Sequence, residues 1–86
     1  MDKLIKSVWE SSRQVEYRNP DVWRQDFAGA LIRRDQYGVM SKIGWVIDHV
    51  KPKSIGGDDS LENLQALHWE NNISKGDEYS EVENFC

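Results

Sequence analysis

Three polar positions in the second half of the chain carry side chains suited to hydrolytic chemistry. The pair Asp48-His49 follows a run of apolar residues, Asn63 comes fourteen residues after His49, and Asn72 comes nine residues later. Histidine can take a proton from water at neutral pH. A carboxylate and an amide oxygen are ligands that a hard divalent cation prefers. Alone, an aspartate–histidine pair is more often a structural hydrogen bond, so the surrounding residues decide between these interpretations.

The elements expected around these positions are a strand, a loop, a second strand and a helix. Residues 44–50 are rich in β-branched and aromatic side chains and predict the clearest strand. Residues 51–62 are polar and contain two consecutive glycines, which supply the backbone freedom of a tight bend. Residues 63–67 alternate and predict a second strand, and residues 70–75 predict a helix that a following glycine caps. The sequence therefore predicts a ββα unit over residues 44–76.

The position of the aspartate–histidine pair places a condition on the first of these strands. Neighbouring residues of a regular strand point to opposite faces of the sheet. Asp48 and His49 can therefore face one site only if the strand bends or bulges there, and Pro52 is compatible with such a break.

The first half of the chain predicts a helix and weaker extended elements. Residues 2–9 place apolar side chains at helical spacing, and residues 11–20 are polar and are expected to form a connector. Residues 21–27 are expected to begin a short helix or to pack irregularly. Residues 29–34 predict a strand weakly, and residues 35–38 predict a turn. Together with the ββα unit, this describes a single α+β domain over residues 1–86.

Composition limits the class of protein. The 86 residues are 38% hydrophobic and 30% charged, which is typical of one small globular domain. The longest apolar runs have three or four residues, whereas a membrane span needs about 20. The first residues do not resemble a signal peptide, and the single cysteine, Cys86, excludes a disulfide framework and a zinc site on paired cysteines. A cytoplasmic protein without structural zinc is expected, with its four tryptophans in the core.

The charge is unevenly distributed along the chain. The net charge is −4, which is unusual for a protein that binds nucleic acids. Residues 1–57 nevertheless contain ten basic and seven acidic residues, whereas residues 58–86 contain one basic and eight acidic residues. Residues 77–86 are expected to form a solvated acidic tail. The bases of the first half permit a nucleic-acid surface without establishing one.

The ordered motifs resemble those of the HNH endonuclease family. The features that carry the resemblance are the pair Asp48-His49, Pro52, the Gly56-Gly57 loop, the run Asn63-Leu64-Gln65, and Asn72 followed by Lys75-Gly76. The pieces Trp9-Glu10, Trp23-Arg24 and Asp35-Gln36-Tyr37-Gly38 also look like the N-terminal half of small stand-alone HNH proteins. Each piece alone is weak, but their common order and spacing make the signal specific.

The resemblance implies a metal-dependent nuclease that acts on DNA and assigns a role to each motif residue. His49 matches the general base that activates water, and Asp48 and Asn72 match the positions that hold one divalent metal ion. Asn63 matches the middle asparagine, whose amide is expected to bond the backbone of the loop and so to orient His49. Magnesium or manganese is favoured because the expected ligands are oxygens, and zinc or nickel remain alternatives.

Contacts to the phosphate backbone are expected from the basic residues near the motif. Lys75 follows Asn72 by three residues, hence on nearly the same helical face, and is expected to contact a phosphate. The candidates for contacts that flank the cut are Arg33, Arg34, Lys51 and Lys53. The pair Arg33-Arg34 is equally typical of a solvated edge.

Several alternatives remain open from the sequence. The chain could be a non-catalytic DNA-binding or partner-recruited module on an HNH scaffold, which its acidic balance favours, and RNA is an alternative substrate. A monomer is the default, and a symmetric dimer is the alternative for a small duplex cutter. Asn71 lies beside Asn72, and the motif spacing selects Asn72 as the ligand. His68 is expected to be packed or hydrogen-bonded rather than a metal ligand.

Overall fold

The computed structural model describes residues 2–76, so the expected acidic tail over residues 77–86, which includes Cys86, lies outside the described residues.

A capped amphipathic helix is the first element of the described residues. Helix α1 (Lys3–Ser11) follows Asp2, whose carboxylate accepts from the backbone N–H groups of Leu4 and Ile5. This contact satisfies N–H groups that the first turn leaves unpaired. The expected helix over residues 2–9 is confirmed and extends two residues further.

A small antiparallel sheet follows α1. It contains β1 (Arg13–Gln14), β2 (Trp23–Gln25) and β3 (Leu31–Arg33) in the order β1-β2-β3. The strand expected over residues 29–34 is confirmed. The connector expected over residues 11–20 contains β1, and the short helix or irregular segment expected over residues 21–27 contains β2, so these two expectations are wrong. Strand β2 is paired on both sides, and this ladder outweighs the weak local preference of three residues.

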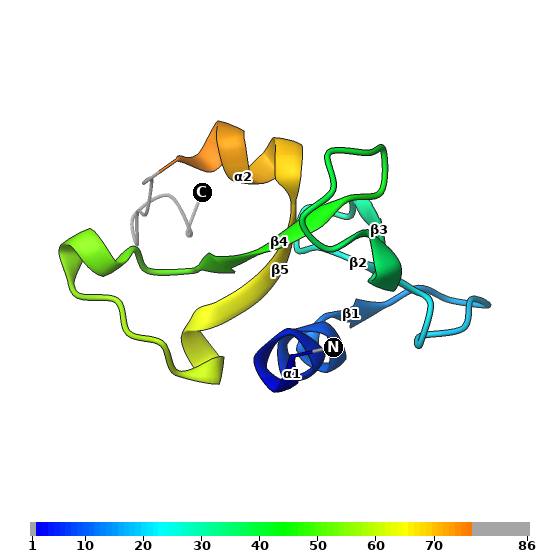
Figure 1. The fold of residues 1–86 in the computed structure, drawn as a ribbon, viewed down its shortest axis with the longest axis horizontal. Helices are drawn as coiled ribbons and strands as arrows, with labels where there is room; N and C mark the ends of the chain where they lie inside the picture. The colour runs from blue at the N-terminus through cyan, green and yellow to red at the C-terminus, as the bar shows by residue number, and fades with distance from the viewer. Residues whose placement is uncertain (1, 77–86) are drawn as a thin grey trace.

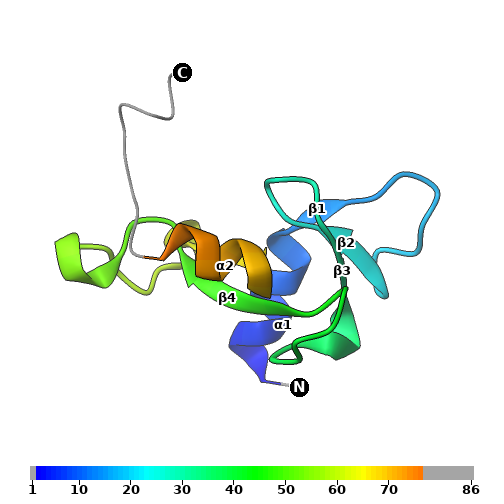
Figure 2. The ribbon, with the colours of Figure 1, turned by 90° about the horizontal axis from the view of Figure 1, so that it is seen from above.

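The predicted ββα unit is confirmed in the second half of the chain. Strand β4 (Trp45–His49) pairs with β5 (Leu64–His68) in an antiparallel hairpin, and helix α2 (Trp69–Lys75) follows β5 directly. Figure 1 shows α2 over one side of the hairpin and α1 on the other, and Figure 2 shows the same layering from above. The long loop over residues 50–63 extends from the end of the hairpin that lies away from the β1-β2-β3 sheet.

The core lies between α1 and the hairpin. Trp9 and Trp45 are fully buried, and their ring centroids are 5.3 Å apart with the planes tilted by 44°. Ile32 and Ala66 pack into the same cluster. The expectation that tryptophans form the core is confirmed for Trp9 and Trp45, since two such rings bury much apolar area in a small domain.

A buried carboxylate connects the two halves of the chain. Asp26 is 1% exposed, and its Oδ1 accepts from the backbone N–H groups of Ala28 and Ala30, at 3.0 and 2.9 Å. Its Oδ2 accepts from the backbone N–H of His68 at 3.1 Å and from the Nδ2 amide of Asn71 at 2.9 Å. Four donors satisfy the two carboxylate oxygens, so the turn after β2 is joined to the end of β5 and to α2.

A buried arginine caps the C-terminal end of α1. Arg24, on β2, is 6% exposed and donates to the carbonyl oxygens of Glu10, Ser12 and Pro20. Its guanidinium therefore satisfies carbonyl groups near the last turn of α1, which no helical N–H can reach.

Neither α1, with nine residues, nor α2, with seven, could cross a bilayer.

Asp26→Ala is expected to lower the free energy of unfolding by about 3 kcal/mol, because it leaves buried donors without an acceptor. Chemical denaturation of the variant and the wild type measures this difference. The control is Asp21→Ala, which removes an exposed carboxylate that is 4.0 Å from Arg34. Its expected change is within about 0.5 kcal/mol. Equal stabilities for the two variants would contradict a structural role for Asp26.

Candidate functional site

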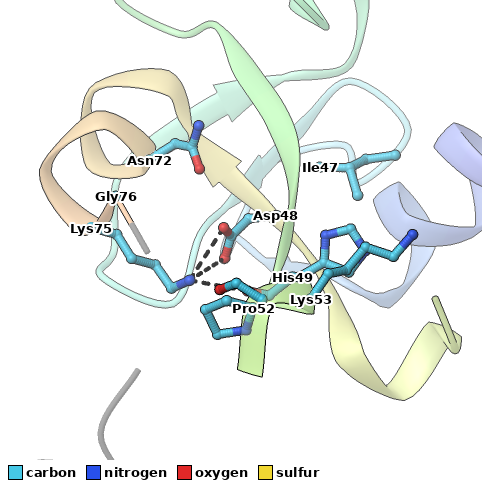
Figure 3. Close-up of a pocket in the computed structure, with 9 residues that line it drawn as sticks. Ile47, Asp48, His49, Pro52, Lys53, Asn72, Lys75 and Gly76 are labelled. Carbon is cyan, nitrogen blue, oxygen red and sulfur yellow. Dashed lines mark hydrogen bonds and ion pairs between the residues drawn. The ribbon is translucent and has the colours of Figure 1, made fainter. Parts of the chain in front are cut away.

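A pocket of about 440 Å³ lies where β4 ends against α2 and the start of the long loop. Its lining includes side chains from all three elements, shown in Figure 3: Asp48, His49, Pro52, Lys53, Asn72 and Lys75. The strand, the loop and the helix of the ββα unit thus bring five of the predicted site residues to one hollow.

Asp48 provides the negative charge of this pocket. Its side chain is 8% exposed, and its two carboxylate oxygens lie 3.3 and 3.2 Å from the ammonium of Lys75. The same ammonium donates to the carbonyl oxygen of His49 at 3.0 Å, and Gln65 donates to Asp48 Oδ2 at 2.9 Å. A cation is therefore held by three oxygens at this point of the pocket, and the ammonium marks a place where positive charge is favoured.

Asn72 enters the pocket from α2, whereas its neighbour Asn71 is turned away. Successive side chains of a helix are about 100° apart, so only one of the two can face the strand squarely. The amide of Asn71 donates to the buried Asp26. Asn72 lines the pocket, as Figure 3 shows. The buried carboxylate thus sets the rotation of α2 that presents Asn72 to the pocket.

The side chain of His49 lies on the other side of β4 from that of Asp48. Figure 3 shows Asp48 pointing toward Lys75 and the ring of His49 beside Lys53. The ladder is regular here, with Asp48 opposite Gln65 and His49 opposite Leu64. The expected bend or bulge at the pair is therefore wrong. Both residues still line the pocket because β4 ends at His49 and the pocket extends around the strand end.

The ring of His49 is held by Asp59 from the long loop. His49 Nε2 lies 2.7 Å from Asp59 Oδ1, and Lys53 Nζ lies 3.0 Å from Asp59 Oδ2. The hydrogen bond from His49, followed by that from Lys53, holds the pKa of the Asp59 carboxyl below its usual value. Sequence reasoning did not find Asp59. One acid of an exposed pair in a loop gives no periodic signal, and only the path of the loop places it at the histidine.

Asn63 braces the two ends of the long loop against each other. Its Oδ1 accepts from the backbone N–H of Lys51 at 2.8 Å, and its Nδ2 donates to the carbonyl oxygens of Lys51 and Asp58, at 3.0 and 2.8 Å. Its own carbonyl accepts from the N–H of Val50 at 2.8 Å. These bonds attach the loop to the segment that directly follows His49.

The other predicted basic residues lie outside the pocket. Arg33 pairs with Asp35 at 3.1 Å, and Arg34 lies 4.0 Å from Asp21, at the far sheet of the molecule. Lys51 is not among the pocket residues either. His68, as expected, is hydrogen-bonded: its Nδ1 accepts from the N–H of Glu70, and its Nε2 lies 2.8 Å from the carbonyl oxygen of Lys42.

The pocket residues suit a hard metal ion. Within residues 2–76 no group of three or more histidine, cysteine, aspartate or glutamate side chains is placed to hold a metal ion. The pocket instead offers the carboxylate of Asp48, the amide of Asn72 and the carbonyl of His49. Magnesium is commonly bound by one or two carboxylates and keeps several waters, so this oxygen set fits it, and the ammonium already held at these oxygens supports the fit.

Comparison with protein families agrees with this geometry. A family model described as HNH endonuclease matches residues 40–78, which contain β4, the loop, β5 and α2. Over residues 40–78 the chain is therefore similar to the HNH endonuclease family. The HNH family indicates nuclease-type activity and a nucleic acid as the bound substrate. Searches of curated proteins and of solved structures gave no match.

Asn63→Ala is expected to loosen the loop of this HNH domain, because it removes three hydrogen bonds to the backbone at Lys51 and Asp58. The expected loss of unfolding free energy is about 2 kcal/mol, with faster hydrogen exchange at the amide of Lys51. Hydrogen exchange measured by NMR tests this. The neighbouring substitution Glu62→Gln serves as the control and should leave the exchange at Lys51 unchanged. Unchanged exchange in Asn63→Ala would contradict the bracing role.

Proposed function

We propose that this HNH domain is a metal-dependent endonuclease that hydrolyses phosphodiester bonds in DNA, with residues 1–86 acting as one domain. The observation that carries the proposal is the meeting of Asp48, His49, Asn72 and Lys75 in one pocket at the end of β4. This combination provides a candidate base, oxygen ligands for a cation and a positive charge for a phosphate. Each is a requirement of phosphodiester hydrolysis.

Asp48 and Asn72 are the residues that would hold one divalent ion, with magnesium or manganese favoured by their oxygen donors. When bound, such an ion stabilises the negative charge that develops on the phosphate and on the leaving oxygen. Two observations support this assignment. The ammonium of Lys75 is paired with Asp48, which shows that positive charge is favoured there, and Asn72 lines the same pocket. Gln65 keeps the carboxylate oriented by its hydrogen bond to Oδ2.

His49 is proposed as the general base that takes a proton from the attacking water. Its ring lies at the pocket rim, 31% exposed, so water and a phosphate can reach it. Asn63 is proposed to orient this base by bracing the segment that follows it. A base must be held at hydrogen-bond distance from its water, and a fixed loop provides that geometry.

The phosphate itself is proposed to meet the lysines of the pocket. Lys75 pairs with Asp48, and its ammonium would be free to contact a phosphate oxygen if a bound cation took over that carboxylate. Lys53 lines the same pocket. Lys51, Arg33 and Arg34 lie outside it and are proposed only as contacts to backbone that flanks the cut. With few bases near the pocket and a net charge of −4, DNA binding should be weak, and its salt dependence should be shallow because few phosphates are neutralised.

A second candidate function is a non-catalytic module that binds DNA or a partner protein. The observation that favours it is the pairing of Lys75 with Asp48, because an ammonium that stays on this carboxylate would keep a metal ion out. The two functions differ in metal binding. Titration with Mn²⁺ should show one site that Asp48→Ala abolishes if the domain is catalytic, and no site if it is only a binding module.

Supercoiled plasmid incubated with the purified chain should be cleaved in Mg²⁺ or Mn²⁺ and not in EDTA, with Zn²⁺ and Ni²⁺ tested in parallel. His49→Ala is expected to lower the rate at least about 100-fold, because a positioned base contributes about 10² to 10⁴ in rate. Asp48→Ala and Asn72→Ala should also abolish metal-dependent cleavage.

Glu62→Gln is the control for the cleavage assay, since Glu62 is exposed and is not among the residues that line the pocket. It should cleave at the wild-type rate. Full metal-dependent cleavage by His49→Ala in a clean preparation would overturn the proposed mechanism. A labelled RNA of the same sequence tests the alternative substrate, and faster cleavage of RNA would overturn the assignment of DNA.

A further inference from the structure

We propose that Asp59 is a positioning residue for His49: its carboxylate holds the ring by Nε2 and leaves Nδ1 as the nitrogen that accepts the proton. This inference rests on the proposed function in one respect, the role of His49 as a base. The arrangement of the two side chains is independent of that role and can be tested without catalysis.

The hydrogen bond between the two side chains determines which ring nitrogen carries the proton. His49 Nε2 lies 2.7 Å from Asp59 Oδ1. An ionised carboxylate can only accept, so Nε2 must be the donor in this bond. In the neutral imidazole only one nitrogen carries hydrogen, and Nδ1 is then left with the free lone pair. The base can therefore take a proton at Nδ1 only.

Lys53 keeps Asp59 available as an acceptor. Its ammonium lies 3.0 Å from Asp59 Oδ2, while Oδ1 faces His49. The two partners use different oxygens of one carboxylate, so they do not compete. The hydrogen bond from His49, followed by that from Lys53, lowers the pKa of Asp59, and the carboxylate stays ionised at neutral pH. Lys53 therefore supports the histidine indirectly, in addition to its place on the pocket wall.

The backbone around Asp59 is placed by Asn63. The amide of Asn63 donates to the carbonyl oxygen of Asp58 at 2.8 Å, one residue before the carboxylate that holds His49. The side chain of Asp58 accepts from the backbone N–H and the hydroxyl of Ser60, which fixes the turn on the other side of Asp59. Asn63, the middle asparagine of the motif, is thus linked to His49 in two indirect ways: through the backbone beside Asp59, and through the segment that follows β4.

This arrangement has a consequence for the proposed reaction. When water attacks phosphorus, its O–H bond breaks, a bond from its oxygen to phosphorus forms, and the proton moves to Nδ1 of His49. The ring then carries a positive charge beside an ionised carboxylate, which stabilises it without taking its proton. The P–O bond to the leaving group breaks, and the leaving oxygen takes a proton from solvent. Asp59 touches neither the substrate nor the reacting atoms.

The test uses the whole chain, free of metal and substrate, with ¹⁵N-labelled histidine. The chain has two histidines, and His68 provides an internal reference. Its Nδ1 accepts from the N–H of Glu70, and its Nε2 faces the carbonyl oxygen of Lys42, so it too must carry its proton on Nε2. Above the pH at which both rings are neutral, long-range ¹H–¹⁵N spectra distinguish a protonated from an unprotonated ring nitrogen.

The wild type should show His49 protonated at Nε2, like His68. In Asp59→Ala the two nitrogen shifts of His49 should move toward each other, and the Nε2 proton should exchange faster with water, while His68 is unchanged. Asp59→Asn retains an acceptor oxygen and should keep the wild-type tautomer. Asn63→Ala should shift His49 in the same direction as Asp59→Ala. Glu62→Gln, which removes a neighbouring negative charge, is the control and should leave the His49 shifts and the exchange of its Nε2 proton unchanged.

Cleavage kinetics provide the second measurement. Asp59→Ala should lower kcat about 10- to 100-fold with KM unchanged, an effect of the size that follows removal of a partner that orients a metal-binding histidine. Asp59→Asn should keep the orientation but lose the charge, and its kcat should lie between those of Asp59→Ala and the wild type. Glu62→Gln should cleave like the wild type.

The spectra and the kinetics separate the two proposals. Identical His49 spectra in the wild type and Asp59→Ala, or a wild-type His49 protonated at Nδ1, would overturn the role of Asp59. If the wild type cleaves nothing with any metal, the proposed nuclease function fails, and the spectra still decide whether Asp59 holds the ring. A kcat of Asp59→Ala equal to that of the wild type, in an active enzyme, would also overturn the positioning role.

Discussion

The buried carboxylate of Asp26 is the interaction on which the arrangement of this domain depends. A charged group that is 1% exposed is tolerated only when donors satisfy it, and here four donors do so. Two come from the turn after β2, one from the end of β5 and one from Asn71 on α2. The bond to Asn71 fixes the rotation of the helix and hence the side chain that faces the pocket. Asp26 lies outside residues 40–78, the segment that matches the HNH family, so the first half of the chain takes part in shaping the pocket.

The charges at and beside the pocket form two groups, one on each side of β4. Asp48 pairs with Lys75 on the α2 side, where both side chains are largely buried. Asp59 pairs with Lys53 and His49 on the loop side, where the groups are more exposed. Asp26 is satisfied by neutral N–H donors alone, whereas the charge of Asp48 is compensated by the ammonium of Lys75. The regular ladder of β4 is what separates the two groups, because neighbouring residues of a strand point to opposite faces.

The differences between expectation and structure have identifiable physical causes. The strand β2 was not expected, because three residues carry little local preference, and their pairing with β1 and β3 decides their conformation. The bulge at Asp48-His49 was expected on the premise that both side chains must face one side of a strand. The strand instead ends at His49, and the pocket extends around its end. The sequence does not indicate the contact of Asp59 with His49, because loop residues have no periodicity that would identify their partners.

The amino-acid sequence by itself determined the ββα order, the resemblance to the HNH endonuclease family and the positions of the motif residues. These depend on local preference and on short spacings: β-branched residues before Asp48, glycines in the loop, and Asn72 three residues before Lys75. The motif spacing selects Asn72, but only the tertiary structure shows why it faces the pocket, which side of β4 each residue of the pair occupies, and that Asp59 holds His49. Each of these depends on contacts between residues distant in sequence, such as Asn71 with Asp26. Local preference does not specify such contacts, because packing of the whole chain selects them.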